Sequence, residues 1–397
     1  MSSRLPVDAE AGSRAPPRFA LFALGFRPFY LAASVFAVLS MLVWISSYAG
    51  LGDVAGARNF LWHAHEMLYG YVIAVVAGFL LTAVRTWTTR PTPTGTMLAL
   101  LVALWIAGRV LAMSTFTTAS ALVNAAFPLA IAIAIAIPLA ASRNTRNYFF
   151  VALLAGFACA VLAFHLAGAG GVDWPPRAGL QAGLDIVLFI MAVVAGRVVP
   201  MFTNNGIPGL AAKRNPWVEK VALGSLLALL AADALRAGDS LVAALCAIAA
   251  LAHAARVFLW QPWRTAGVPL VWILHAAYAW IVVHLAMRAL ALAGIGSVSL
   301  AAHALTIGAI GGLTLGMMTR TSRGHTGLPL KADRVDTACY VLVMLAAVVR
   351  VFGGLVAAPH YTATVVASGL LWSAAFALFA VRYAPILSRS RADGKPG

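Results

Sequence analysis

The chain has 397 residues, of which 62% are hydrophobic and only 10% are charged, and its formal net charge is +16. Soluble domains average about a quarter charged residues, so this composition excludes an ordinary soluble enzyme. The long continuous apolar runs also exclude a transmembrane β-barrel, whose strands alternate in hydrophobicity.

Apolar runs of about 20 residues repeat from end to end, which predicts an all-α polytopic membrane protein with about twelve transmembrane helices. Residues 26–386 are expected to form one domain, and residues 1–25 and 387–397 to be disordered tails. The third and eighth segments are short. The predicted spans are 28–50, 61–84, 96–114, 119–141, 147–169, 179–201, 216–236, 239–259, 268–292, 299–319, 335–356 and 361–385.

The basic residues predict an orientation. An even number of spans places both termini on one side, and that side carries 21 of the 28 Lys and Arg residues, against 5 on the other side and two within spans. The positive-inside rule therefore predicts that both termini are cytoplasmic. Basic loops that face anionic headgroups account for the net charge without a nucleic-acid partner.

The cysteines and the first apolar segment bear on three features: disulfides, covalent haem attachment and a cleaved signal peptide. Cys159, Cys246 and Cys339 fall in three different spans, so no disulfide framework is expected. No Cys-x-x-Cys-His motif occurs, which excludes covalent c-type haem attachment. The first apolar run is long enough to span and no clear Ala-x-Ala site follows it, so we expect no cleaved signal peptide.

Polar side chains within the apolar runs indicate chemistry, because a membrane-buried imidazole or carboxylate is costly unless it is paired, solvated or coordinated. The predicted topology gives each histidine a depth. The outer layer contains His63, His65, His165, His284 and His303, and a thinner inner layer contains His253 and His275. His325 follows span ten on the cytoplasmic side.

Span two opens with Trp62-His-Ala-His-Glu-Met67. On a regular helix His63 and His65 point about 200° apart, and His63 shares a face with Glu66 and Met67. Alternatively, an unwound first turn would bring both imidazoles to one metal. Imidazole with a thioether suits copper, whereas imidazole alone suits haem iron or copper, and the sequence leaves both open.

Other polar and small residues also allow two interpretations. Gly308 and Gly312, continued by Gly316, form a stripe that permits close helix packing or, alternatively, the approach of a flat macrocycle. Arg109 and Asp185 lie inside spans three and six, where they could pair with each other, or Arg109 could bind a propionate.

Five segments of this chain resemble the NnrS family of bacterial inner-membrane proteins, which are described as containing haem and copper and are linked to nitric oxide metabolism and denitrification. The resemblance covers about residues 20–385. The segments are Leu24-Gly-Phe-Arg-Pro-Phe-Tyr30, Trp62-His-Ala-His-Glu-Met67, Gly78-Phe-Leu-Leu-Thr-Ala83, His303-Ala-Leu-Thr-Ile-Gly308 and Gly316-Met-Met-Thr-Arg-Thr-Ser-Arg-Gly-His-Thr-Gly327. Pro269–His275 and Phe164-His165 are similar less distinctively, whereas His284 falls where the family more often has a small residue.

The resemblance implies a multi-pass haem–copper protein of the bacterial inner membrane that acts on nitric oxide and receives electrons from an unknown donor. With it, we expect an outer metal site with His63, His65, His165 and His303 as ligands. Glu66, or failing that Asp185, would pass protons, or Glu66 would orient a metal-bound imidazole. On the inner side, His275 with His253 would hold a haem, and Arg320, Arg323 and His325 would bind its propionates or a metal.

Three functional hypotheses compete. The first is a nitric oxide reductase-like or detoxifying oxidoreductase, and the second is a protein that binds nitric oxide without turnover. The third is a transporter, which would require broken helices with midplane charges in matching halves that the sequence does not show.

Overall fold

A computed structural model describes residues 19–52 and 59–394, and within these ranges all regular structure is helical. The elements are α1 (Phe26–Tyr48), α2 (Phe60–His65), η1 (Glu66–Val72), α3 (Ile73–Thr88), α4 (Gly95–Leu111), α5 (Thr117–Ala141), η2 (Thr145–Asn147), α6 (Phe149–Gly168), α7 (Pro176–Gly206), α8 (Pro216–Ala234), α9 (Asp239–Leu259), η3 (Pro262–Arg264), α10 (Pro269–Leu292), α11 (Val298–His303), η4 (Ala304–Gly311), α12 (Gly312–His325), α13 (Arg334–Val356), η5 (Ala358–His360) and α14 (Tyr361–Ser388).

The predicted class is confirmed: the chain is an all-α membrane protein, and its described residues form twelve helical segments, of which ten are long and apolar enough to cross a bilayer. The other two are α4, with 17 residues, and α8. Although the eighth predicted span was expected to be short, it corresponds to a long apolar candidate. The seventh predicted span corresponds to α8, which is less apolar than the ten candidates because Glu219, Lys220 and Asp233 lie within its 19 residues.

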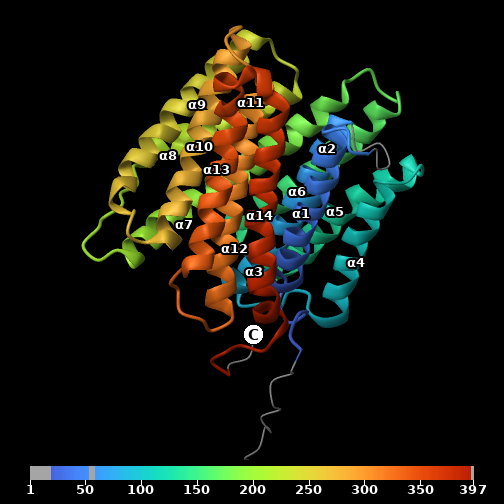
Figure 1. Cartoon of the computed structure of the whole chain (residues 1–397). Helices are drawn as coiled ribbons and strands as arrows, with labels where there is room; N and C mark the ends of the chain where they lie inside the picture. Colours follow the sequence, from blue (N-terminus) through green and yellow to red (C-terminus); the bar gives the residue numbers. More distant parts are fainter. Residues whose placement is uncertain (1–18, 53–58, 395–397) are drawn as a thin grey trace, which may run out of the picture.

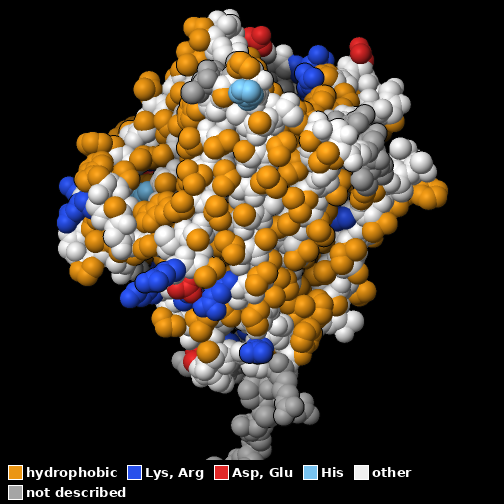
Figure 2. Space-filling model, in the orientation of Figure 1, with side chains coloured by type: hydrophobic (Ala, Val, Ile, Leu, Met, Phe, Trp, Pro, Cys, Tyr) orange, Lys and Arg blue, Asp and Glu red, His pale blue; other side chains and the backbone are white. Residues whose placement is uncertain are grey.

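The helices form one bundle in which neighbours in sequence mostly pack side by side, and the chain closes on itself where α1 packs against α14 (Figure 1). Hydrophobic side chains cover the middle of the visible surface, and charged side chains lie mainly towards its two ends (Figure 2). This pattern fits a bundle whose middle faces lipid.

Both ends of the described chain lie at one end of the bundle, which we call the termini side; the opposite end is the far side (Figure 1). The backbone N–H of Ala20 donates to Ser388 O at 2.8 Å, and the Arg27 guanidinium donates to Leu387 O and Arg389 O. The described parts of the two predicted tails, residues 19–25 and 387–394, are therefore bonded to the bundle. Residues 1–18 and 395–397 lie outside the described residues.

Two spans contain a π-helix, and each π-helix begins one residue after a histidine. The second span runs from α2 through η1 into α3, and the tenth runs from α11 through η4 into α12. A π-helical turn holds an extra residue, which changes the direction of the following side chains and occurs often at functional sites. The two spans meet where the hydroxyls of Tyr71 and Thr314 lie 2.6 Å apart.

Candidate functional site

Three buried polar side chains form a hydrogen-bonded chain on the far side. His65 ends α2, and its Nδ1 lies 2.6 Å from Oε1 of Glu66, the first residue of η1. Arg109, in the last turn of α4, donates Nη1–H to both Glu66 oxygens at 2.8 Å. The exposed fractions of these residues are only 3%, 1% and 8%. Their pairing reduces the cost of charge in an apolar bundle.

A second imidazole completes what we call the far-side histidine site: His65, Glu66, Arg109 and His165. His165, near the end of α6, places Nε2 3.1 Å from His65 Nε2. A carboxylate paired with a guanidinium only accepts, so His65 carries its proton on Nδ1 and presents the Nε2 lone pair to His165. A carboxylate on the distal nitrogen is the arrangement that orients metal-binding histidines.

Arg109 is fixed by a further neighbour as well as by Glu66. Its Nη2 donates to Asn124 Oδ1 of α5, and Asn124 Nδ2 donates to Ser120 O at 2.8 Å. The predicted Arg109–Asp185 ion pair is therefore wrong, because α4 directs Arg109 towards the start of η1 and α5.

The predicted grouping of His63 with Glu66 is also wrong. Glu66 contacts His65 and Arg109 instead. The reason is local: the α-helix ends at His65, and the wider turn that starts at Glu66 alters the i to i+3 alignment assumed from a regular helix.

His63 belongs to a different cluster on the same side. Its ring stacks on Trp44 of α1 at a centroid distance of 4.1 Å. His303, which ends α11, and Arg350 of α13 lie within electrostatic range of His63. We call His63, His303 and Arg350 the far-side basic cluster. The expected single site with His63, His65 and His303 is thus not formed, because α2 is regular and points its two histidines to opposite sides.

Asp185 lies in a third buried group. Gln181 Nε2 donates to its Oδ1 at 2.9 Å, and Arg288 Nη1 of α10 lies 3.5 Å from the same oxygen. Arg288 Nη2 also donates to both oxygens of Asp233 on α8, at 2.7 and 2.8 Å. One guanidinium therefore faces two carboxylates.

On the termini side, His275 presents a free lone pair. The Thr203 hydroxyl donates to Val199 O at 2.8 Å, so its oxygen accepts from His275 Nε2–H at 2.7 Å. That bond leaves the lone pair on Nδ1, which is buried and has no partner among the described residues. His275 lines a cavity of about 390 Å³ together with Trp263 and Trp272. This is the geometry of a candidate ligand beside a space for an aromatic group.

His253 does not join His275 in that site. The Tyr278 hydroxyl accepts from Arg256 Nη1, so it donates to His253 Nδ1, each at 2.5 Å. Trp260 lies between Tyr278, at 4.7 Å between ring centroids, and His275, at 6.2 Å. Because its Nδ1 accepts, His253 keeps its proton on Nε2 and offers no lone pair, so the predicted pairing of the two histidines is not formed.

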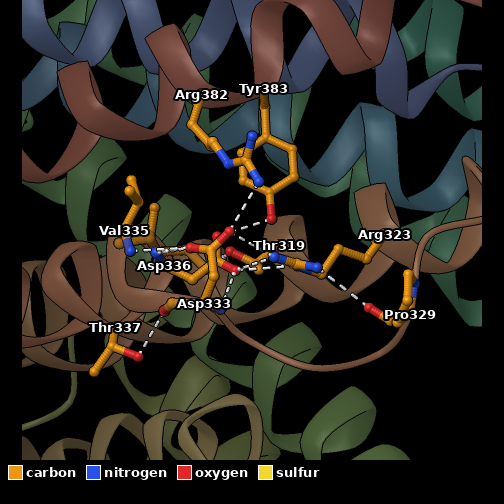
Figure 3. Close-up of polar contacts among 10 residues, drawn as sticks. Thr319, Arg323, Pro329, Asp333, Val335, Asp336, Thr337, Arg382 and Tyr383 are labelled. Atoms are coloured by element: carbon orange, nitrogen blue, oxygen red, sulfur yellow. Dashed lines mark hydrogen bonds and ion pairs between the residues drawn. The ribbon is translucent and has the colours of Figure 1, made fainter.

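The arginines after span ten differ from one another. Arg323 donates to Asp336 Oδ2 at 2.8 and 3.0 Å and to Asp333 Oδ2 at 2.9 Å, in a network that Tyr383 and Arg382 join (Figure 3). Asp333 also caps α13. Arg323 is thus occupied by the chain's own carboxylates, which contradicts its predicted role towards a propionate.

Arg320 and His325 remain without a carboxylate partner among the described residues. The Arg320 guanidinium lies 3.6 Å from the centroid of the Phe202 ring, a cation–π contact. The His325 ring lies 5.6 Å from that of Phe26, and Arg391 donates to the His325 carbonyl at 2.9 Å. His325 is therefore part of the packed end of the bundle on the termini side.

The glycine stripe of span ten packs against α10. A Cβ at Gly308 would collide with the Trp280 indole, and one at Gly312 would lie 2.6 Å from the Ala277 Cβ. This surface is filled by neighbouring side chains, which favours close helix packing over the approach of a macrocycle.

An apolar cavity of about 80 Å³ lies in the bundle interior, next to the residues that follow both π-helices. Its wall combines α3, α7 and α12, with single residues of α1 and α10, and includes Val75, Phe79, Val194, Leu313 and Met317. Dry apolar cavities accept small apolar molecules and exclude water.

Several site residues were not found from the sequence. Asn124 and Asp233 were not singled out, and Arg350 was counted only among the basic residues of the non-cytoplasmic side. A charge near the end of an apolar run was the available signal for Asp233 and Arg350, but the residues around each of them lie on other spans. Among the described residues, no group of three or more His, Cys, Asp or Glu side chains has metal-binding geometry.

These features define a polytopic helical membrane protein with buried histidine and ion-pair clusters on both sides and, among the described residues, two spans interrupted by π-helices. The chain belongs to the NnrS family, whose model, described as NnrS protein, matches residues 20–391. The family is linked to the response to nitric oxide. The comparison with curated proteins gave no match.

Proposed function

We propose that this protein binds copper and haem and consumes nitric oxide reductively at the far-side histidine site. One observation carries the proposal: the Nε2 atoms of His65 and His165 converge to 3.1 Å, while Glu66 holds the other nitrogen of His65. Family membership supports the choice of nitric oxide.

The separation of the two imidazoles fits a shared metal ion. Metal–imidazole bonds are about 2.0 Å long, so two such ligands at a tetrahedral angle have nitrogens about 3.3 Å apart. The observed 3.1 Å needs little adjustment. Imidazole suits copper, and His165, which donates Nε2–H to His65 here, would carry its proton on Nδ1 instead when both Nε2 atoms bind the metal.

For haem, the best candidate ligand is His275, through its free Nδ1 on the termini side. The cavity of about 390 Å³ and the two tryptophan side chains that line it fit an aromatic ring system. Arg320 has no carboxylate partner among the described residues, so we propose it as the residue that would contact a haem propionate. When bound, copper and haem iron would supply the electron-transfer chemistry that reduction of nitric oxide requires.

The chain's own residues would orient ligands and supply protons. The reaction converts two nitric oxide molecules, two electrons and two protons into nitrous oxide and water, with the electrons coming from an unknown donor. Arg109 binds Glu66 so fully that Glu66 fits the orienting role better than that of a relay. Asp185 then remains the candidate proton carrier, because it shares one guanidinium with Asp233.

A second candidate function, nitric oxide binding without turnover, is favoured by that same engagement of Glu66, since it leaves no free acid at the site. The apolar cavity of about 80 Å³ fits a small neutral gas in either case. Nitrous oxide release from the purified protein with a reductant separates the two, because a binding protein consumes nitric oxide only to stoichiometry.

The metal assignment has a direct test. His65→Ala and His165→Ala should each lose copper in elemental analysis of the purified full-length protein, whereas His360→Ala, which removes an exposed histidine, should retain it. Retention of copper in both site variants would refute the proposed site. Loss of the haem absorption band in His275→Ala tests the second site independently.

We also propose that both termini are cytoplasmic and that the protein resides in a bacterial inner membrane. The charge bias between the two sets of loops supports this. Reporter fusions at the loop after α4 and at the loop after α3 should give opposite compartments, the first of them periplasmic.

A further inference from the structure

A buried arginine of α13 has no anionic partner among the described residues. Arg350 is 7% exposed, and its Nη1 is buried without a hydrogen-bond acceptor. It lies six residues before the end of α13, about 9 Å along the helix axis. The Arg350 guanidinium lies 5.6 Å from the centroid of the Tyr361 ring, which is a cation–π contact.

The other buried arginines show how this fold treats such a charge. Carboxylates pair with Arg109, Arg256, Arg288 and Arg323. The backbone carbonyls of Leu387 and Arg389 accept from Arg27. A guanidinium in a membrane bundle needs a counter-charge or several acceptors, because it cannot lose its proton. Arg350 thus differs from the others in lacking the partner that its surroundings require.

The side chains around Arg350 are imidazoles, and they supply no negative charge to pair with it. His303 donates Nδ1–H to Ser299 O at 2.6 Å. His63 Nδ1 is buried and has no partner, and its ring is held against Trp44. Because α11 packs against α13, His303 and Arg350 lie on neighbouring helices, and both are within electrostatic range of His63; no carboxylate among the described residues pairs with any of the three.

We infer that the far-side basic cluster binds an oxyanion. A cation is disfavoured there by the fixed charge of Arg350, which separates this cluster from the far-side histidine site, where Glu66 supplies a negative charge. Arginine binds carboxylates and oxyanions by paired N–H donors, and His63 Nδ1 can donate to the same group.

A small free oxyanion can provide this chemistry, whereas the haem proposed beside His275 lies on the termini side, away from this cluster. We choose nitrite, the oxyanion that one-electron reduction with two protons converts into nitric oxide and water. The choice of nitrite rests on the proposed function, whereas the charge argument does not.

The experiment uses purified full-length protein in detergent and chloride-free buffer. Nitrite is titrated by calorimetry into the parent protein, Arg350→Gln and Arg177→Gln. Arg177 is a matched control, because it is an exposed arginine in the first turn of α7 on the same side. If Arg350→Gln is not folded, Arg350→Lys is used, which keeps the charge but loses the paired donors.

Arg350→Gln should weaken nitrite binding at least about tenfold, the loss expected for a hydrogen bond to a charged group, and Arg177→Gln should not. Unchanged nitrite affinity in Arg350→Gln, or no nitrite binding to the parent protein, overturns the inference.

A further variant separates this inference from the proposed function. His165→Ala removes a proposed copper ligand but no member of the basic cluster, so it should keep the parent's nitrite affinity. If His165→Ala retains copper while Arg350→Gln loses the anion, the proposed copper site fails and the oxyanion site stands. If His165→Ala abolishes nitrite binding and Arg350→Gln does not, the nitrite binds at the other site and the inference is wrong.

Discussion

Replacement of Glu66 tests the central ion pair most directly. Glu66→Leu leaves the Arg109 guanidinium, 8% exposed, without its two 2.8 Å hydrogen bonds to the carboxylate. Removing one partner of a buried pair typically costs about 3–5 kcal/mol, because the remaining charge is unpaired. Replacing both partners, as in Glu66→Leu with Arg109→Met, should cost much less than the sum of the two single changes.

The free energy of unfolding would be measured in mixed micelles for the four proteins of this double-mutant cycle. The matched control is Arg382→Gln, which removes an ion pair to Asp333 in which the side chains are 43% and 35% exposed. That control should change the unfolding free energy by at most about 1 kcal/mol. A cost below about 1 kcal/mol for Glu66→Leu, or strict additivity of the two single changes, would refute the argument that this pair is buried and coupled.

The same residue should control metal affinity. Glu66→Gln keeps the shape of the side chain but weakens the hold on His65 Nδ1–H. Loss of such an orienting partner typically lowers metal affinity about 10- to 100-fold. Copper titration of Glu66→Gln against the parent measures this, and an unchanged dissociation constant would exclude the orienting role.

Three further predictions concern packing and pH. Gly308→Ala should cost about 1–3 kcal/mol of unfolding free energy, because the added Cβ overpacks against α10. Gly224→Ala is the control, since its added Cβ meets nothing within 4 Å, and it should be neutral or stabilising. Equal effects of the two changes would contradict the close packing. Tyr71→Phe removes the hydroxyl that bonds Thr314 and should cost about 1 kcal/mol, measured by the same unfolding assay; no loss would show that this bond does not join the two spans. Burial raises the pKa of Asp333, but the backbone N–H of the residue at the third helix position and the Arg382 guanidinium lower it more, so the net pKa lies below its ordinary value of 3.8. The ionised carboxylate therefore stabilises the fold above pH 3.8, and this contribution is lost as the pH falls through the lower pKa of the folded state. The loss of unfolding free energy in Asp333→Asn should be full near neutral pH and should shrink below pH 3.8. A loss that does not change with pH would contradict this sign.

The sequence by itself determined the class of protein, the approximate helical segments and the polar residues that matter. A membrane helix needs about 20 apolar residues, and this requirement is visible in any single segment. For the same reason Glu66, Arg109 and Asp185 stood out: each is a charge inside an apolar run. The family motifs around His65 and His303 likewise follow from the order of residues alone.

The tertiary structure decided which of these residues meet. Arg109 binds Glu66 and not Asp185, and His65 meets His165 while His63 stacks on Trp44, because partners are set by which helices pack together. The grouping of His63 with Glu66 holds only on a regular helix of about 3.6 residues per turn, whereas a π-helix begins at Glu66 and changes the direction of its side chain. Hydrogen bonds within one helix are local and follow from the sequence of that helix, but a buried charge takes its partner from another span, and only the packed bundle fixes that choice.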